Sequence, residues 1–93
     1  MASYPDSKDI RKIKKWPYTD FLGLIEFIRP LVEPMGRVTV KRSGRVEIAT
    51  GGWSGNEEII GAMRSNYGVW SLTWESSHRG GLFVFKNRRL TDG

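Results

Sequence analysis

The chain has 93 residues, no cysteine, and 15 Lys and Arg against 10 Asp and Glu, so its formal net charge at pH 7 is +5. The absence of cysteine excludes a disulfide scaffold, a thiolate zinc site and a cysteine nucleophile. The apolar runs are too short to cross a bilayer, and no secretory signal is recognisable at the N-terminus. We therefore expect a small protein that does not enter membranes and whose basic balance favours anionic partners.

The positive charge is concentrated at the two ends of the chain. Residues 1–16 carry five Lys or Arg against two Asp or Glu, a net charge of +3, and residues 86–93 carry a net charge of +2. Residues 17–85 are neutral. Any anion site on the body must therefore be local.

Three segments are expected. Residues 1–16 form either a loosely ordered basic arm or a short helix capped by Ser7, and both alternatives remain open. Residues 17–86 form one α+β domain, and residues 87–93 form a polar basic tail. Apolar residues at three-residue spacing would attach the first segment to the body: Ile10, Ile13 and Trp16.

Residues 17–34 predict an amphipathic helix. Thr19 or Asp20 occupies the N-cap position. Pro30 cannot donate to the helical ladder, so the helix is expected to end or kink near Arg29. The apolar stripe, at three- and four-residue spacing, consists of Phe21, Leu24, Ile25 and Ile28.

Two short alternating strands follow, over residues 37–42 and 45–50. Ser43-Gly44 between them is typical of a tight hairpin turn. The side chains expected to face the core are Val38, Val40, Val46 and Ile48.

The second half of the chain predicts a helix and two more strands. Ser54 and Glu57 have the spacing of a capping box, and Gly68 is a suitable stop for the helix that follows. Residues 82–86 are apolar on both faces, which is typical of a central strand. The helix should bury Ile59, Ile60 and Met63. A strand over residues 69–76 should turn three side chains inward, namely Trp70, Leu72 and Trp74.

This order of elements, α-β-β-α-β-β, indicates an α+β fold in which helices cover one face of a four-stranded antiparallel sheet. The strand directions allow two orders, 2-1-3-4 and 1-2-4-3, and the sequence does not choose between them. In both orders, the loop with Gly51 and Gly52 and the loop with Gly80 and Gly81 lie at one end of the sheet.

That end of the sheet is the first candidate site, for a phosphate-bearing ligand such as a nucleotide or a nucleotide-derived signal. A helix start favours anions, glycines allow close approach, arginine offers a planar donor fork and indoles stack on bases. Each residue also has a structural interpretation: glycine pairs make turns, Ser54 caps a helix, Trp74 packs in the core and Arg79 is a solvated charge. The ligand-binding residues are Gly51, Gly52, Trp53, Ser54, Asn56, Trp74 and Arg79.

Two other functions remain open. The basic residues could contact nucleic-acid phosphates nonspecifically, or could simply form a solvated rim. The protein could instead inhibit a protein complex through Trp53 or an edge strand, and self-association is compatible with either role. The nucleic-acid alternative rests on Lys12, Lys14, Lys15, Arg42, Arg45, Arg88 and Arg89.

Signals for catalysis are weak, and we predict no enzyme activity, no cofactor and no metal site. His78 is the only histidine, and pairing it with Ser76 or Ser77 in one short loop leaves no third orienting group. Glu75 is the remaining candidate for acid–base work, and it could equally be an ion-pair partner of Arg79.

The strings TGGWSGNEEIIGAMRSN and VWSLTWESSHRGGLFVF resemble a family of small proteins, encoded by tailed bacteriophages and prophages, whose activity is not established. The resemblance covers most of residues 9–86 and falls on residues 51–57 and 79–81. It implies a setting, the cytoplasm of a bacterial host, and an accessory binding role such as counter-defence. It implies no mechanism.

Overall fold

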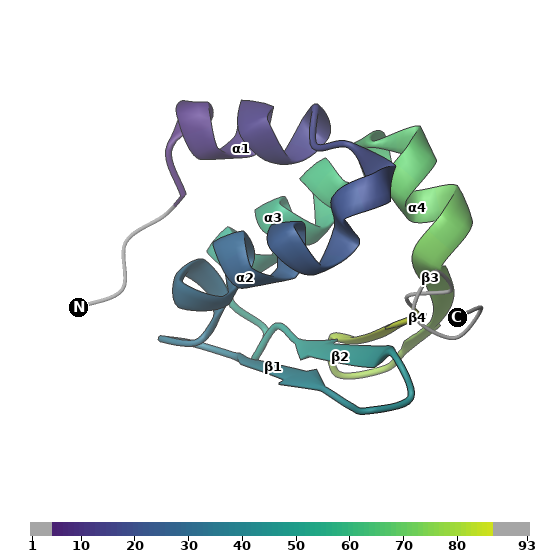
Figure 1. The fold of residues 1–93 in the computed structure, drawn as a ribbon. Helices are drawn as coiled ribbons and strands as arrows, with labels where there is room; N and C mark the ends of the chain where they lie inside the picture. The colour runs from purple at the N-terminus through teal and green to yellow at the C-terminus, as the bar shows by residue number, and fades with distance from the viewer. Residues whose placement is uncertain (1–4, 87–93) are drawn as a thin grey trace.

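A computed structural model describes residues 5–86 (Figure 1). Within this range the fold is α+β, with four helices and a four-stranded antiparallel sheet. The strand order β1-β2-β4-β3 is one of the two orders that the strand directions allowed. The basic tail expected over residues 87–93 lies outside the described residues. The elements are α1 (Ser7–Lys14), a 3-10 turn η1 (Tyr18–Asp20), α2 (Phe21–Val32), β1 (Arg37–Val40), β2 (Arg45–Ala49), α3 (Ser54–Ser65), α4 (Tyr67–Thr73), β3 (Trp74–His78) and β4 (Leu82–Lys86).

The first segment of the chain contains the short helix α1, one of the two alternatives left open. Its N-cap is Asp6, whose Oδ1 accepts from the backbone N–H of Asp9 at 2.9 Å, and Ser7 is already inside the first turn. Ile13 is fully buried, and Ile10 and Trp16 pack partly buried against the core. Helix α1 packs on α3, and in Figure 1 α2 and α3 lie between it and the sheet.

Helix α2 begins as expected but does not end at Arg29. Asp20 caps it by accepting from the N–H of Gly23 at 3.3 Å, and the predicted apolar stripe is buried. The helix continues through Pro30 to Val32. Proline removes only one hydrogen bond at this place, whereas the last turn brings the fully buried Val32 into the core.

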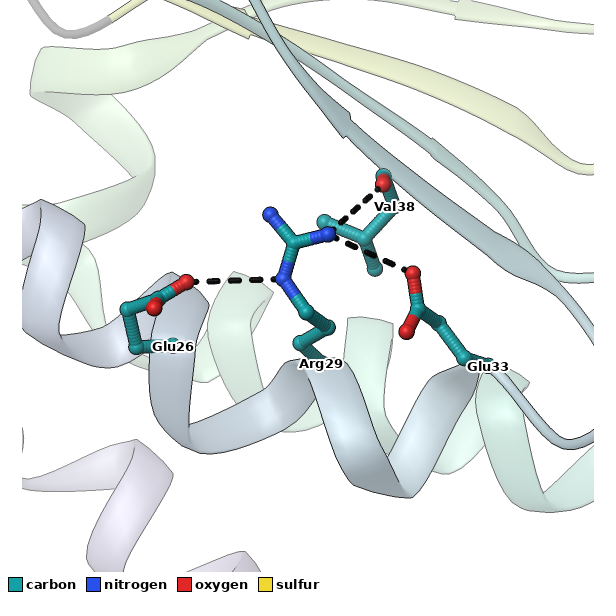
Figure 2. A network of polar contacts seen from close by, with 4 residues as sticks. All are labelled: Glu26, Arg29, Glu33 and Val38. Atoms are coloured by element: carbon teal, nitrogen blue, oxygen red, sulfur yellow. Dashed lines mark hydrogen bonds and ion pairs between the residues drawn. The ribbon is translucent and has the colours of Figure 1, made fainter.

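Arg29 holds this last turn against the sheet, as Figure 2 shows. Its Nε lies 3.4 Å from Glu26 Oε2, and its Nη1 lies 3.3 Å from Glu33 Oε2. The same Nη1 donates to the carbonyl of Val38 in β1 at 3.3 Å. One guanidinium therefore links two turns of α2 to the edge strand of the sheet.

The face of the sheet that meets α2 and α3 carries most of the apolar strand residues. The prediction that β4 is a central strand is confirmed, because it lies between β2 and β3. Val40 was expected to face the core but is 38% exposed, since it ends the edge strand β1. The tight hairpin between β1 and β2 is closed by a bond from the N–H of Gly44 to the carbonyl of Lys41. The strand residues of the core are Val38, Val46, Ile48, Phe83 and Phe85.

The predicted strand over residues 69–76 is wrong in its first part. Residues 67–73 form helix α4, and strand β3 begins only at Trp74. Val69 and Thr73, four residues apart, are buried, whereas Leu72 and Trp74 are 46% and 37% exposed. Helical spacing thus overrides the period-two alternation of the tryptophans. Trp70 instead stacks on Trp74, with ring centroids 5.6 Å apart.

Asn66 forms the junction between α3, α4 and α1, and Gly68 lies inside α4 instead of ending α3. Asn66 Oδ1 accepts from the N–H of Val69 at 3.3 Å and so caps α4. Its Nδ2 donates to the carbonyls of Ile13 at 2.9 Å and Trp16 at 2.8 Å. The C-terminal end of α1 is therefore held by a residue 50 or more positions away.

We predict that Asn66→Ala lowers the free energy of unfolding by about 2–3 kcal/mol, because two carbonyls lose their side-chain donor and α4 loses its cap. For a domain of this size the melting temperature should fall by roughly 10–20 °C. Urea and thermal unfolding followed by circular dichroism measure both quantities. Ser65→Ala, at the exposed neighbouring position, is the control and should change stability by less than about 0.5 kcal/mol. Equal stability of the two variants would contradict the role of Asn66.

Candidate functional site

The two Gly-Gly loops meet at one end of the sheet, as the strand directions predict. The N–H of Thr50 donates to the carbonyl of Gly81 at 2.9 Å. A Cβ at Gly81 would overlap Thr50 Oγ1 and lie 3.6 Å from Glu57 Oε2. Thr50, which precedes the first loop, is therefore in direct contact with Gly81 of the second loop.

Asn56, at the same end of the sheet, points into the core and not toward solvent. Its side chain is fully buried, and its Nδ2 donates to the carbonyls of Val32 at 3.1 Å and Thr50 at 3.0 Å. The amide thereby ties the end of α2 to the end of β2. Its Oδ1 is buried and has no hydrogen-bond partner among the described residues. The prediction of Asn56 as an accessible ligand donor is wrong, because the side chain points into the core.

The capping box expected at Ser54 is not formed. The N-cap position belongs to Trp53, and Ser54 is the first helical residue. Glu57 accepts a hydrogen bond from Thr50 Oγ1 at 2.7 Å, and the same hydroxyl oxygen accepts from the N–H of Gly52 at 3.3 Å. Thr50, at the end of β2, organises the helix start in place of Ser54.

The tryptophans of the predicted site have contacts within the fold, and its arginine is exposed. The indole of Trp53 lies over the backbone of Gly55, where a Cβ would overlap its ring. Trp74 belongs to the stack with Trp70 and donates from Nε1 to Ser77 Oγ at 3.0 Å. Arg79 is exposed in the loop between β3 and β4. Glu57 Oε2 lies beside both loops, and its negative charge disfavours a phosphate there.

Gly51 and Gly52 have the same left-handed backbone, with φ of +68° and +77°, but different surroundings. A Cβ at Gly51 would overlap the carbonyl oxygen of Met35, whereas a Cβ at Gly52 meets nothing within 4 Å. We predict that Gly52→Ala costs about 1 kcal/mol of stability from backbone strain alone. Gly51→Ala should cost about 1–3 kcal/mol more, because the turn between α2 and β1 must move. Urea denaturation of the two variants tests this, and equal losses would contradict it.

A different feature, on α1, has the character of a binding site. Lys8, Arg11 and Lys12 follow the spacing i, i+3 and i+4, which places them on one face of the helix, opposite Ile13, and the C-cap Lys15 continues this spacing at i+7. All four line an open groove of about 540 Å³. We name this the cationic groove; its lining is Lys8, Arg11, Lys12, Lys15, Trp16, Pro17 and Asp20.

Trp16, one of the residues that line this groove, is held rigidly. Its Nε1 donates to the carbonyl oxygen of Asp20 at 2.9 Å and to Asp20 Oδ2 at 3.2 Å. Its ring packs against Phe27, with centroids 5.3 Å apart, and Lys12 Nζ lies 5.9 Å from its centroid. The indole is therefore fixed on the core and still partly exposed.

The cations of the groove have no carboxylate partner among residues 5–86, whereas three cations of the body do. Arg29 lies between Glu26 and Glu33 (Figure 2), and Lys41 and Arg45 both pair with Glu47. None of the α1 cations forms such a pair with another described residue. Their positive charge is not neutralised within the described part of the chain.

The other members of the nucleic-acid alternative do not join this groove. Lys14 is exposed on α1 but does not line the groove, and Arg42 and Arg45 belong to the β1–β2 hairpin. That hairpin lies on the far side of the helical layer from α1 (Figure 1). Arg88 and Arg89 lie outside the described residues. The groove was not predicted from the sequence. The spacing of its cations, i, i+3, i+4 and i+7, indicates a common face only if residues 7–14 form a helix.

The residues weighed for acid–base chemistry in the sequence lie on β3. Ser76 Oγ and His78 Nε2 lie 2.8 Å apart, and both side chains belong to β3. No group of three or more His, Asp or Glu that could hold a metal occurs among residues 5–86. Within the same range, no helix has the length and apolar character needed to cross a membrane.

Comparisons with known proteins do not decide the function. No family model, no curated protein and no solved structure matches the chain.

Proposed function

We propose that the protein binds nucleic acid through the cationic groove, by contacts to phosphates. The observation that carries this proposal is the placement of Lys8, Arg11, Lys12 and Lys15 on one exposed face of a helix that is docked on the core. These cations lack carboxylate partners among the described residues, so an external anion is the group that can neutralise them.

The distance between the first and last cations of the groove suits a polyanion. Lys8 and Lys15 are seven residues apart, which corresponds to about 10 Å along a helix axis. At a rise of about 3.4 Å per step of one strand, this distance spans roughly three nucleotide steps. A single small anion would engage only part of the array.

Local helix energetics do not account for the array. Cations in the last turn of a helix complement its dipole, which explains Arg11 and Lys12. Lys8 is in the first turn, where the dipole disfavours it. Like charges three and four residues apart also destabilise a helix slightly. A ligand that carries several negative charges accounts for both features.

A lipid surface is disfavoured by the same geometry. Amphipathic helices that bind membranes insert their apolar face between lipids. In α1 the apolar side is occupied, because Ile13 is fully buried and Ile10 packs against the core. Only the polar face is available to a partner, which favours nucleic acid over membrane.

We propose as its setting a bacteriophage accessory role in the cytoplasm of a bacterial host. The support for this setting is the resemblance of residues 51–57 and 79–81 to the phage and prophage family. The stretch DIRKIKKWP, over residues 9–17, also resembles the start of that family, and it includes most residues of the cationic groove.

We predict that Lys8→Gln combined with Lys15→Gln weakens binding to a labelled DNA duplex or single strand. The slope of log affinity against log salt should become shallower by about 1.4–1.8, because two phosphate contacts are lost. Fluorescence anisotropy across a salt series measures this. Arg42→Gln combined with Arg79→Gln removes the same charge elsewhere and should leave the slope within about 0.5 of the wild type. Deleting residues 1–15 is a poorer test, because it removes the buried Ile13.

Three outcomes would contradict the proposal. The first is no binding of any nucleic acid at about 50 mM salt. The second is an equal loss in both double variants, which would show that net charge alone matters. The third is tight binding to vesicles of anionic lipid with none to nucleic acid.

A further inference from the structure

We infer that the cationic groove takes an unpaired nucleotide of a single strand, with its base against Trp16 and its phosphates along α1. This inference rests on the proposed function and adds a preference for one form of nucleic acid. It follows from the shape of the groove, the fixed position of the indole and the one-sided distribution of charge.

The groove has the size and the mixed chemistry of a nucleotide site. Its volume of about 540 Å³ has room for a nucleotide, and the groove is widely open to solvent, so a chain can continue past it. Most of the exposed lining is carbon, supplied by Trp16, Pro17 and the aliphatic stems of the Lys and Arg side chains. A flat apolar base and a charged phosphate are the two parts of a nucleotide, and the groove presents a surface for each.

Trp16 is prepared for stacking before any ligand arrives. Two bonds from Nε1 to Asp20 and the contact with Phe27 fix the orientation of the indole. A base that stacks on a fixed ring causes little further loss of side-chain entropy. Stacking on an aromatic side chain is independent of base identity, so the site should accept any base.

The charges of the groove give the nucleotide a direction. The four cations come from α1 and its C-cap, which form the α1 wall of the groove, whereas Asp20 caps α2 and already accepts from the Trp16 indole and the N–H of Gly23. A phosphate is attracted to the α1 wall and repelled by the Asp20 carboxylate. The sugar-phosphate chain should therefore follow α1 while the base points toward Trp16.

A duplex cannot make the same contact. Its bases are stacked and paired inside the helix, and moving one outward costs a few kcal/mol. A duplex would reach only the cations of α1. A single strand offers the same phosphates together with free base faces, so it should bind more tightly.

The experiment compares three labelled probes with the full-length protein: an oligothymidylate, an abasic strand of the same length and a duplex of the same length. For the wild type we expect the oligothymidylate to bind about fivefold to a hundredfold more tightly than the abasic strand, which is the range of one stacked base. The duplex should bind like the abasic strand. Anisotropy at about 50 mM salt measures all three affinities.

Variants of Trp16 separate stacking from charge. Trp16→Leu should bring the ratio of oligothymidylate to abasic affinity to about one while the abasic affinity stays unchanged, which also shows that α1 remains docked. Trp16→Phe keeps an aromatic face and should retain part of the ratio. Trp74→Leu removes an exposed indole outside the groove and should leave the ratio as in the wild type.

The outcomes distinguish the inference from the proposed function. Equal affinities for all three probes, or an unchanged ratio in Trp16→Leu, would overturn base binding and leave phosphate binding standing. No affinity for any probe would overturn both. If Trp74→Leu instead brings the ratio of oligothymidylate to abasic affinity to one, the base binds at the Trp70–Trp74 stack, and the inference is overturned.

Discussion

The Asn66 side chain is the contact on which the arrangement of the helical layer depends. Its amide nitrogen donates to the carbonyls of Ile13 and Trp16, and its oxygen accepts from the N–H of Val69. One side chain thus satisfies backbone groups at the end of α1 and at the start of α4, while its own backbone ends α3. Because buried polar groups need partners, this position requires both donors and an acceptor on a short side chain, which is what asparagine offers.

The docking of α1 decides which of its surfaces meets solvent. With Ile13 turned into the core, the cations at positions 8, 11, 12 and 15 must lie on the open side. An isolated helix of eight residues is marginal in water, and like charges along one face weaken it further. Burial of Ile13 and the bonds from Asn66 offset that repulsion. The core therefore holds in place a charge array that the segment would not maintain alone.

The end with the two Gly-Gly loops shows where sequence reasoning succeeds and where it stops. Strand direction alone requires the two loops to share one end, and the bond between Thr50 and Gly81 shows that they touch. The roles of the side chains there follow from packing instead. Asn56 turns inward to the carbonyls of Val32 and Thr50, and Glu57 takes the hydroxyl of Thr50. Helical or strand spacing cannot reveal such contacts, because the partner lies on another element.

By itself the sequence determined the α+β class, the helix stripe that begins at Phe21, the β1–β2 hairpin and the central strand β4, since these follow from local periodicity and turn chemistry. Only the tertiary structure decided that residues 67–73 are helical and that α1 is docked. Trp70 and Trp74 fit a strand by alternation, but burial of Val69 and Thr73 against the core selects the helix. The cationic groove likewise exists only because Asn66 and Trp16, 50 residues apart, meet in the fold. Contacts between distant segments settle such choices, because the local preferences differ by less free energy than the burial they permit.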